Sequence, residues 1–217
     1  MTVHSNPASI SLPLIDMAGV REGDPSAIAR AGEAIRKACS EIGFFYIINH
    51  GVPQKVIDAA MAAAKTFFAF PAEVKRQVAV NKRHRGWHAL GGALMYEATK
   101  PDFKEFFSMG LELPEDDPCV LAGEALRGPN QWPDFMPELR LALDAYYEEI
   151  GEAGADLLKA VAVGLGIAPA FFEPKYGKRL QRTQMVYYPP HPPRAETDQF
   201  GVAPHTDYGC ITLLYQD

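Results

Sequence analysis

The chain has 217 residues, of which 47% are hydrophobic and 22% charged, so it is long enough for one good-sized domain of an ordinary globular protein. Its formal net charge of −6 argues against a nucleic-acid partner, because binding phosphates requires a basic surface. No stretch contains the about eighteen uncharged apolar residues of a membrane-spanning helix, so we expect no membrane partner.

The amino-terminal part predicts a strand, a helix and a second strand. Residues 10–15 alternate apolar side chains with Ser and Pro, as an edge strand does. Asp24 followed by Pro25 is typical of a helix start, and an apolar stripe at three- and four-residue spacing continues to Gly43. The apolar run 44–48 then predicts a strand that is buried on both faces.

A second helix is predicted for residues 54–68, because apolar residues recur there at helical spacing until Pro71 ends the pattern. Small and apolar side chains form its expected inner face, namely Val56, Ala60, Ala64 and Phe67. We expect this helix to pack against the core through that face.

Residues 80–94 combine basic side chains and glycines with Trp87. We interpret them as a solvated surface loop anchored by the tryptophan. The alternative is that they line a pocket for an acidic or polar substrate. His84 and His88 are four residues apart, but glycines follow closely and no acidic residue accompanies them, so a metal site here is not expected.

The middle of the chain predicts one strand, over residues 103–111. Its alternation places Phe106 and Ser108 on one face and Phe107 and Met109 on the other. The two faces differ in polarity, so we expect one of them to pack on the core.

A surface excursion and a long helix should follow. Residues 114–132 are rich in Pro, Asp and Gly, which is typical of a loop. Beyond Pro133 the longest apolar stripe of the chain predicts a helix of about thirty residues, roughly 45 Å long, that backs the sheet. Phe171 and Phe172 predict a short helical turn after it.

The carboxyl-terminal part contains a candidate metal-binding pair, His205 and Asp207. An imidazole and a carboxylate two residues apart on an extended segment project to the same side. Nitrogen and oxygen ligands of this kind suit Fe(II), which two His and one carboxylate bind on one face while leaving the other positions open. By itself an H-x-D triplet says little in a chain with six histidines.

The surroundings of the pair are more specific. Tyr-Tyr-Pro-Pro at 187–190 precedes it, and the hydrophobic run 211–215, an expected strand, follows it. Together with G-F-F-Y-I-I-N-H-G-V-P at 43–53 and K-P-D-F-K-E-F-F at 100–107, this region resembles the isopenicillin N synthase-like branch of the iron(II)/2-oxoglutarate-dependent oxygenases. The matches follow the order of that family over nearly the whole chain.

The resemblance implies an α+β fold with a double-stranded β-helix (jelly roll) core that is incomplete in this chain, a helical amino-terminal region and one long backing helix. Three regions are expected: an amino-terminal dioxygenase-like region over 1–110, the excursion and long helix over 111–180, and the start of the jelly roll over 181–217.

The resemblance also implies the site. His205 and Asp207 would bind Fe(II), with 2-oxoglutarate and dioxygen as cosubstrates and Tyr188 in contact with the 2-oxoglutarate. Where many plant members have Asn, this chain has Val186, which removes one polar contact. Pocket residues for a small-molecule substrate correspond by position to Phe106, Ser108 and Gln184.

Other candidate ligands are not expected to bind the metal. His50 lies in a turn that family members carry away from the iron, and Asp16, His84 and His88 fall on an outer strand and a surface loop. His191 lies in a proline-rich loop and is expected to pack rather than to bind metal.

The implied activity is oxidation or hydroxylation of a small molecule, with succinate and carbon dioxide as coproducts. The family's second iron-binding His and its Arg-x-Ser lie beyond Asp217, so we expect a fragment of a longer enzyme that is inactive alone. A 2-oxoglutarate-independent oxidase of the same fold, or a catalytically inactive truncated member, are the alternatives. A zinc hydrolase is disfavoured because no further His clusters near the pair.

The compartment is expected to be the cytoplasm. Cys39, Cys119 and Cys210 are odd in number and widely spaced, which fits a reducing environment better than a disulfide framework. The first residues lack the basic start and the apolar run of a signal peptide.

Overall fold

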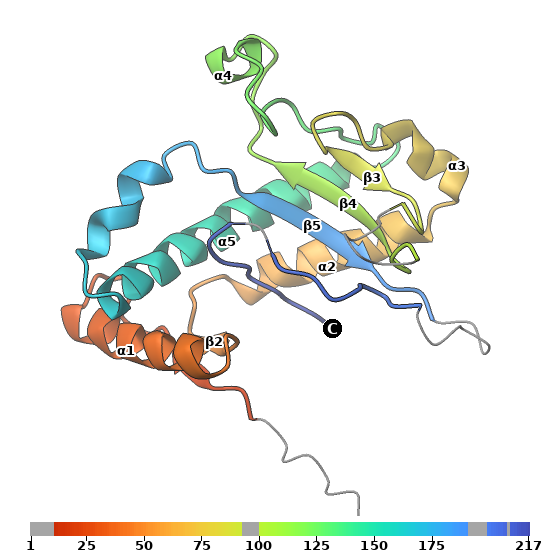
Figure 1. Cartoon of the computed structure of the whole chain (residues 1–217). Coiled ribbons are helices and arrows are strands. Elements are labelled where there is room, and N and C mark those ends of the chain that lie inside the picture. Colours follow the sequence, from red (N-terminus) through yellow and green to blue (C-terminus); the bar gives the residue numbers. More distant parts are fainter. Residues whose placement is uncertain (1–10, 93–99, 191–198, 208) are drawn as a thin grey trace, which may run out of the picture. The chain divides into compact units, whose positions relative to one another are not determined.

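The computed structural model describes residues 11–92, 100–190, 199–207 and 209–217. These residues combine helices with two small β-sheets (Figure 1), as an α+β fold requires. No helix in this described part is long and apolar enough to cross a membrane.

The chain divides into two compact units that are discontinuous in sequence. The first unit contains the residues up to Gly51 together with Glu152–Lys175, and the second unit contains Val52–Gly151 and Tyr176–Asp217. The three regions expected from the sequence divide the chain at other positions and stay a prediction.

The first unit begins with strand β1 (Leu14–Asp16) and helix α1 (Pro25–Glu41). Asp24 caps α1 as predicted, since its Oδ1 accepts a hydrogen bond from the backbone nitrogen of Ser26 at 2.9 Å. Strand β2 (Tyr46–Ile48) pairs with β1 in parallel and forms a two-stranded sheet. The 3-10 helix η2 (Pro169–Lys175) contains the predicted turn at Phe171 and Phe172.

The prediction that residues 44–48 form a strand buried on both faces is wrong. Phe44, Tyr46 and Ile48 are 72%, 57% and 40% exposed. The reason is that β2 has β1 as its partner in a sheet of two strands, and such a sheet packs on the rest of the first unit through one face. Ile15 on β1 is buried there.

Helix α1 lies close to the last part of helix α5 (Pro137–Gly164) within the first unit. Their contact is made at two glycines. A Cβ added to Gly32 would lie 2.7 Å from the carbonyl oxygen of Ala160, and a side chain at Gly164 would clash with the backbone of Gly32. Backbone therefore meets backbone at this crossing. The 28-residue length of α5 confirms the predicted long helix.

The second unit is built on a three-stranded antiparallel sheet in the order β3-β4-β5. Its strands are β3 (Gly86–His88), β4 (Glu105–Gly110) and β5 (Arg182–Tyr187). All six residues of β4 pair with β5, from Glu105 opposite Tyr187 to Gly110 opposite Arg182. A closed jelly roll stays a prediction, because the described strands form this sheet and the two-stranded one.

Helix α2 (Gln54–Ala69) and the first part of α5 cover one face of that sheet (Figure 1). Phe107 and Met109 of β4 point into this core, as the predicted alternation requires, and Phe67 of α2 packs on Phe107 with ring centroids 5.3 Å apart. The inner face of α2 differs from the predicted one, since Ile57 and Ala63 are buried where Val56 and Ala64 were expected. Both sets have helical spacing, so only the packing partner selects between them.

Two loop and strand expectations are also wrong. Residues 86–88 were expected in a surface loop but form β3, with Trp87 buried in the core. The strand begins at a glycine with φ 107°, and the residues before it show no apolar alternation, so the sequence gives no strand signal there.

Residues 211–215 were expected as a strand, yet no ladder of backbone hydrogen bonds pairs 211–217 with another segment of the described chain.

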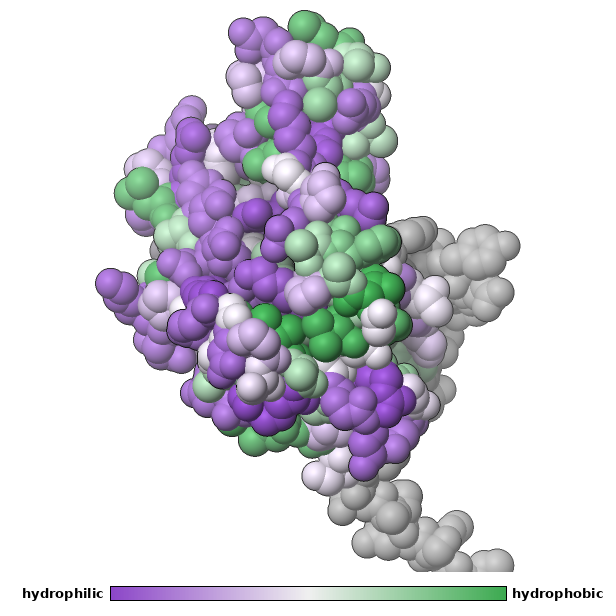
Figure 2. Space-filling model, turned by 90° about the vertical axis from the view of Figure 1, so that its left-hand side faces the viewer, coloured by the Kyte–Doolittle hydropathy of each residue, from purple (hydrophilic) through white to green (hydrophobic). Residues whose placement is uncertain are grey.

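The predicted excursion between β4 and α5 carries the short helix α4 (Pro118–Leu121). Figure 2 shows hydrophilic and hydrophobic surface side by side on this excursion, at the top of the view. Lys178 contacts it, with Nζ 3.1 Å from Asp117 Oδ2. Two further short helices follow α2, namely α3 (Ala72–Lys75) and η1 (Arg76–Val78).

A buried ion pair joins α3 to the sheet. Lys75 Nζ lies 2.8 Å from Glu105 Oε2, and Trp87 Nε1 donates a hydrogen bond to the same oxygen at 2.6 Å. Lys75 also donates to the carbonyl oxygen of Phe68 at 3.0 Å. One cluster therefore connects α2, α3, β3 and β4.

Replacing Glu105 by Ala should destabilise the second unit by about 3–5 kcal/mol, because the Lys75 ammonium then stays buried without its counter-charge. Urea unfolding followed by tryptophan fluorescence measures the effect, since Trp87 and Trp132 both lie in this unit.

The matched control for this substitution is Glu115→Ala, which removes an exposed ion pair with Arg83 and should leave the unfolding midpoint unchanged. A Glu105→Ala protein as stable as the native one would contradict the interpretation.

Candidate metal centre and substrate face

The side chains of His205 and Asp207 converge. His205 Nε2 lies 3.1 Å from Asp207 Oδ1. Two ligand atoms each about 2.1 Å from an octahedral ion, at a right angle to each other, lie about 3.0 Å apart. The donor types and their separation therefore fit an iron(II) ion bound by both residues.

The hydrogen bonds around the pair indicate the tautomer of His205. His205 Nδ1 is 2.8 Å from the carbonyl oxygen of Ala203, and a carbonyl only accepts, so Nδ1 carries a proton. Nε2 of a neutral ring then turns a lone pair toward the carboxylate of Asp207. Two such acceptors repel each other unless a cation, either a proton or a metal ion, lies between them. Thr212 Oγ1 donates to Asp207 Oδ2 at 2.6 Å and leaves Oδ1 for that cation.

Asp102 holds the segment that carries this pair. It is 1% exposed, and its Oδ1 accepts a hydrogen bond from the backbone nitrogen of Ala203 at 2.9 Å. Lys104 Nζ lies 2.9 Å from the other carboxylate oxygen. Phe103 and Phe200 add a backbone hydrogen bond of 2.8 Å. Residues 101–104 therefore fix residues 199–203 and, through Ala203, the ring of His205.

Tyr188 lies beside the same segment. Its ring packs against Gly201, where an added Cβ would come within 2.9 Å of a ring carbon. Burial, and then the negative charge of Asp102, raise the pKa of Tyr188. The phenol thus stays protonated and can donate a hydrogen bond. Its expected contact with 2-oxoglutarate stays a prediction.

The three residues expected in the substrate pocket lie together on one face of the sheet. Ser108 pairs with Gln184 across β4 and β5, and Gln184 Nε2 donates to Ser108 Oγ at 3.0 Å. Phe106 lies two residues away on the same face, opposite Val186. The structure brings these three together, and their contact with a substrate stays a prediction.

Sequence reasoning missed several polar residues on or next to this face. His88 stacks on Phe106 with ring centroids 4.0 Å apart, and Arg182 Nη2 donates to Ser108 Oγ at 3.4 Å. Arg85 is buried beside them. The basic residues within 80–94 were the available signal for His88 and Arg85. They supported the alternative interpretation, in which this stretch lines a pocket.

That the other candidate ligands do not bind metal stays a prediction. His50 and Asp16 belong to the first unit, whereas His205 and Asp207 belong to the second. Asp16 Oδ1 accepts a hydrogen bond from Asn49 Nδ2 at 2.8 Å. His84 sits in a turn at φ 57°. His191 is outside the described residues, among which no group of three His, Cys, Asp or Glu side chains is arranged to hold a metal ion.

Comparisons with known proteins identify the family. Residues 12–135 match the family described as non-haem dioxygenase in morphine synthesis, N-terminal. The chain is 34% identical over 212 residues to the 2-oxoglutarate-Fe(II) type oxidoreductase hxnY of Emericella nidulans, an alignment that covers 94% of this chain and 60% of that protein.

Solved structures point the same way. A 2OG-Fe(II) oxygenase family protein from Caulobacter crescentus superposes with a TM-score of 0.71 at 27% identity, over 84% of this chain and 57% of that one. JOX2 in complex with 2OG, Fe and JA gives a TM-score of 0.62, also at 27% identity, over 85% of this chain and 51% of that one.

The chain spans about 60% of the length of the curated relatives it matches. The matching family region covers more than half of the chain, and both hxnY and the Caulobacter protein are described as using 2-oxoglutarate and Fe(II). The chain therefore belongs to the isopenicillin N synthase-like family of iron(II)- and 2-oxoglutarate-dependent oxygenases.

Proposed function

We propose that the protein is an Fe(II)- and 2-oxoglutarate-dependent oxygenase that hydroxylates or oxidises a small molecule and forms succinate and carbon dioxide. The observation that carries this proposal is the 3.1 Å approach of His205 Nε2 to Asp207 Oδ1 in a chain of this family. That JOX2 was solved with 2OG, Fe and JA supports a small molecule as the substrate.

His205 and Asp207 would hold the iron. Together with 2-oxoglutarate, the bound iron supplies the activation of dioxygen. The protein's own residues orient the two metal ligands. Ala203 fixes the ring of His205, and Thr212 fixes the carboxylate of Asp207. Tyr188, whose ring packs on Gly201 in the segment that leads to the pair, would contact the cosubstrate.

The substrate would lie on the face of the sheet that carries Phe106, Ser108 and Gln184. Because β4 and β5 are fully paired, that face is rigid, and rigid positioning is what substrate orientation requires. We further propose that this sheet belongs to a jelly-roll core and that the protein works in the cytoplasm. The free thiols of Cys39, Cys119 and Cys210 fit a reducing compartment.

Metal binding tests the proposal directly. The chain is expected to bind Fe(II) weakly under anaerobic conditions, because it offers two protein ligands, and His205→Ala or Asp207→Ala should abolish the binding. Equilibrium dialysis against Fe(II) measures this. The matched controls are His50→Ala and His84→Ala, which should bind as the native chain does.

The same titration separates 2-oxoglutarate dependence from an oxidase that does not use it. Added 2-oxoglutarate should tighten Fe(II) binding, because its keto acid provides two further donors, whereas succinate lacks the keto group and should not. Equal behaviour of the two dicarboxylates would favour the 2-oxoglutarate-independent oxidase. Binding that survives both His205→Ala and Asp207→Ala would refute the proposed metal site.

Asp102 is expected to act as a positioning residue. Asp102→Ala removes the acceptor for the Ala203 nitrogen and should weaken Fe(II) affinity about 10- to 100-fold, the range seen when an outer partner of a metal ligand is lost.

The matched control is Asp102→Asn, which removes the ion pair with Lys104 but keeps a side-chain oxygen that can accept from the Ala203 nitrogen, so its Fe(II) affinity should stay close to native. Equal losses in the two variants would show that the ion pair, not the orientation of His205, controls the affinity.

A further inference from the structure

One face of the β3–β4–β5 sheet carries polar side chains with no acidic group among them. The face opposite the packed core presents His88, Phe106, Ser108, Arg182 and Gln184, because alternate residues of paired strands point the same way. We call these five residues the polar face. Its polar groups are basic or neutral, and none of the five is acidic.

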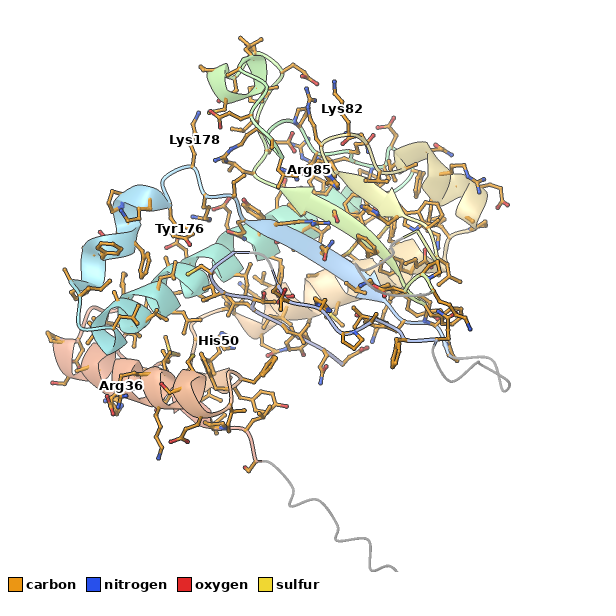
Figure 3. The ribbon with its side chains drawn as sticks, in the orientation of Figure 1. Arg36, His50, Lys82, Arg85, Tyr176 and Lys178 are labelled. Atoms are coloured by element: carbon orange, nitrogen blue, oxygen red, sulfur yellow. The ribbon has the colours of Figure 1, made fainter. Side chains whose placement is uncertain are left out.

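Arg85 lies at the end of this face. It is 3% exposed, and Figure 3 shows it beside β4, near the end that leads to the α4 excursion. A Cβ on Gly110 would collide with its guanidinium, so the absence of a side chain there makes the room for it. Its Nη2 donates to the carbonyl oxygen of Leu126 at 2.6 Å. Its Nε is buried and has no hydrogen-bond partner in the described part of the chain.

Arg182 is the second cation, and it faces Gly110 across the β4–β5 ladder. Its described hydrogen bond goes to the neutral Ser108 Oγ, which also accepts from Gln184. Within the described residues no carboxylate forms an ion pair with either Arg182 or Arg85. Burial lowers the pKa of both guanidinium groups. For Arg85 the charges of Arg182 and Arg127 lower the pKa as well, whereas Tyr147 and Glu112 act in the opposite direction.

His88 completes the set. Its Nε2 is buried without a hydrogen-bond partner in the described structure. Burial, followed by the charges of Arg182 and His84, lowers the pKa of His88 to about 4, so the ring is neutral at pH 7. A neutral imidazole can donate one hydrogen bond to an anion without adding charge.

The buried atoms Arg85 Nε and His88 Nε2 lack the hydrogen bonds that buried polar groups almost always have. Arg182 is exposed, so a carboxylate can reach its guanidinium from solvent. A carboxylate bound there would also compensate the nearby charge of Arg85. Arginine is suited to this role because its planar fork matches the two oxygens of a carboxylate.

We propose that the polar face is an anion subsite that binds the carboxylate of a small-molecule substrate, with Arg182 as the residue that contacts it and Arg85 as a fixed neighbouring positive charge. This inference rests on the proposed function, because it names the substrate class of the same site.

The geometry also bounds the size of the substrate. Arg182 is the first residue of β5 and Tyr188 follows the last one, so six residues and about 20 Å of extended chain separate them. The Arg182 guanidinium reaches toward Ser108, two residues along, which shortens the distance from Tyr188 to about 13 Å. A substrate that spans this distance has its carboxylate well separated from the carbon that reacts near His205.

The test uses phenylacetate as the probe and the whole 217-residue chain without metal. Ligand-detected NMR should show phenylacetate binding, and Arg182→Gln should weaken it about tenfold or more, because a charge-assisted pair is lost. Arg182→Lys should fall in between, since an ammonium keeps the charge but lacks the fork. Phenylacetamide, which has the same shape without the charge, should not bind.

Two controls complete the design. Lys178→Gln removes another cation of the second unit, one paired with Asp117, and should bind phenylacetate as the native chain does. His205→Ala should also keep phenylacetate binding, so failure of the metal site and failure of the anion subsite give different results. Circular dichroism of Arg182→Gln checks that the variant is folded.

Because 2-oxoglutarate also carries carboxylates, a third experiment distinguishes a subsite for the substrate from a subsite for 2-oxoglutarate. In Arg182→Gln the tightening of Fe(II) binding by 2-oxoglutarate should be unchanged. Loss of that tightening would assign the subsite to the cosubstrate and overturn the proposal. So would the absence of phenylacetate binding, equal binding by Arg182→Gln, or binding of phenylacetamide.

Discussion

The pairing of β4 with β5 is the constraint on which the second unit depends. It joins residues 105–110 to residues 182–187 along six residue pairs, although these segments are more than seventy positions apart in the sequence. Because a strand alternates its side chains, this one ladder creates two faces at once. Phe107 and Met185 enter the core under α2 and α5, while Ser108 and Gln184 meet on the other face.

The metal pair depends on a second, smaller connection. Asp102 immediately precedes β4 and binds the backbone of Ala203, whose carbonyl in turn fixes the ring of His205. A buried carboxylate of this kind is favourable only when it is paired and hydrogen-bonded, and Lys104 and Ala203 meet both conditions. The segment just before β4 therefore orients His205, while β4 itself carries Phe106 and Ser108. The metal pair and the substrate face thus depend on the same segment of the chain.

The two faces of the sheet differ in how their charged side chains are paired. On the core side, Lys75 is buried together with Glu105, so the charges compensate within the protein. On the polar face, Arg85 and Arg182 have no carboxylate partner among the described residues, and Gly110 leaves the space in which one guanidinium lies. Stability explains the first arrangement. The second leaves the buried Arg85 without an ion-pair partner in the described part of the protein, which is a common feature of binding sites.

Helix positions, strand alternation and the family were determined by the sequence alone. Asp24 predicts the start of α1, and the apolar stripe predicts α5. The residues around His205 and Asp207 indicate the family. These predictions succeed because capping, periodicity and motif spacing are local properties of the sequence. Tertiary structure decided the rest. It placed Gly86–His88 in the sheet, left Phe44 exposed and set Arg85 over Gly110. These outcomes depend on which distant segment supplies the partner strand or the covering layer, and no local pattern records that choice.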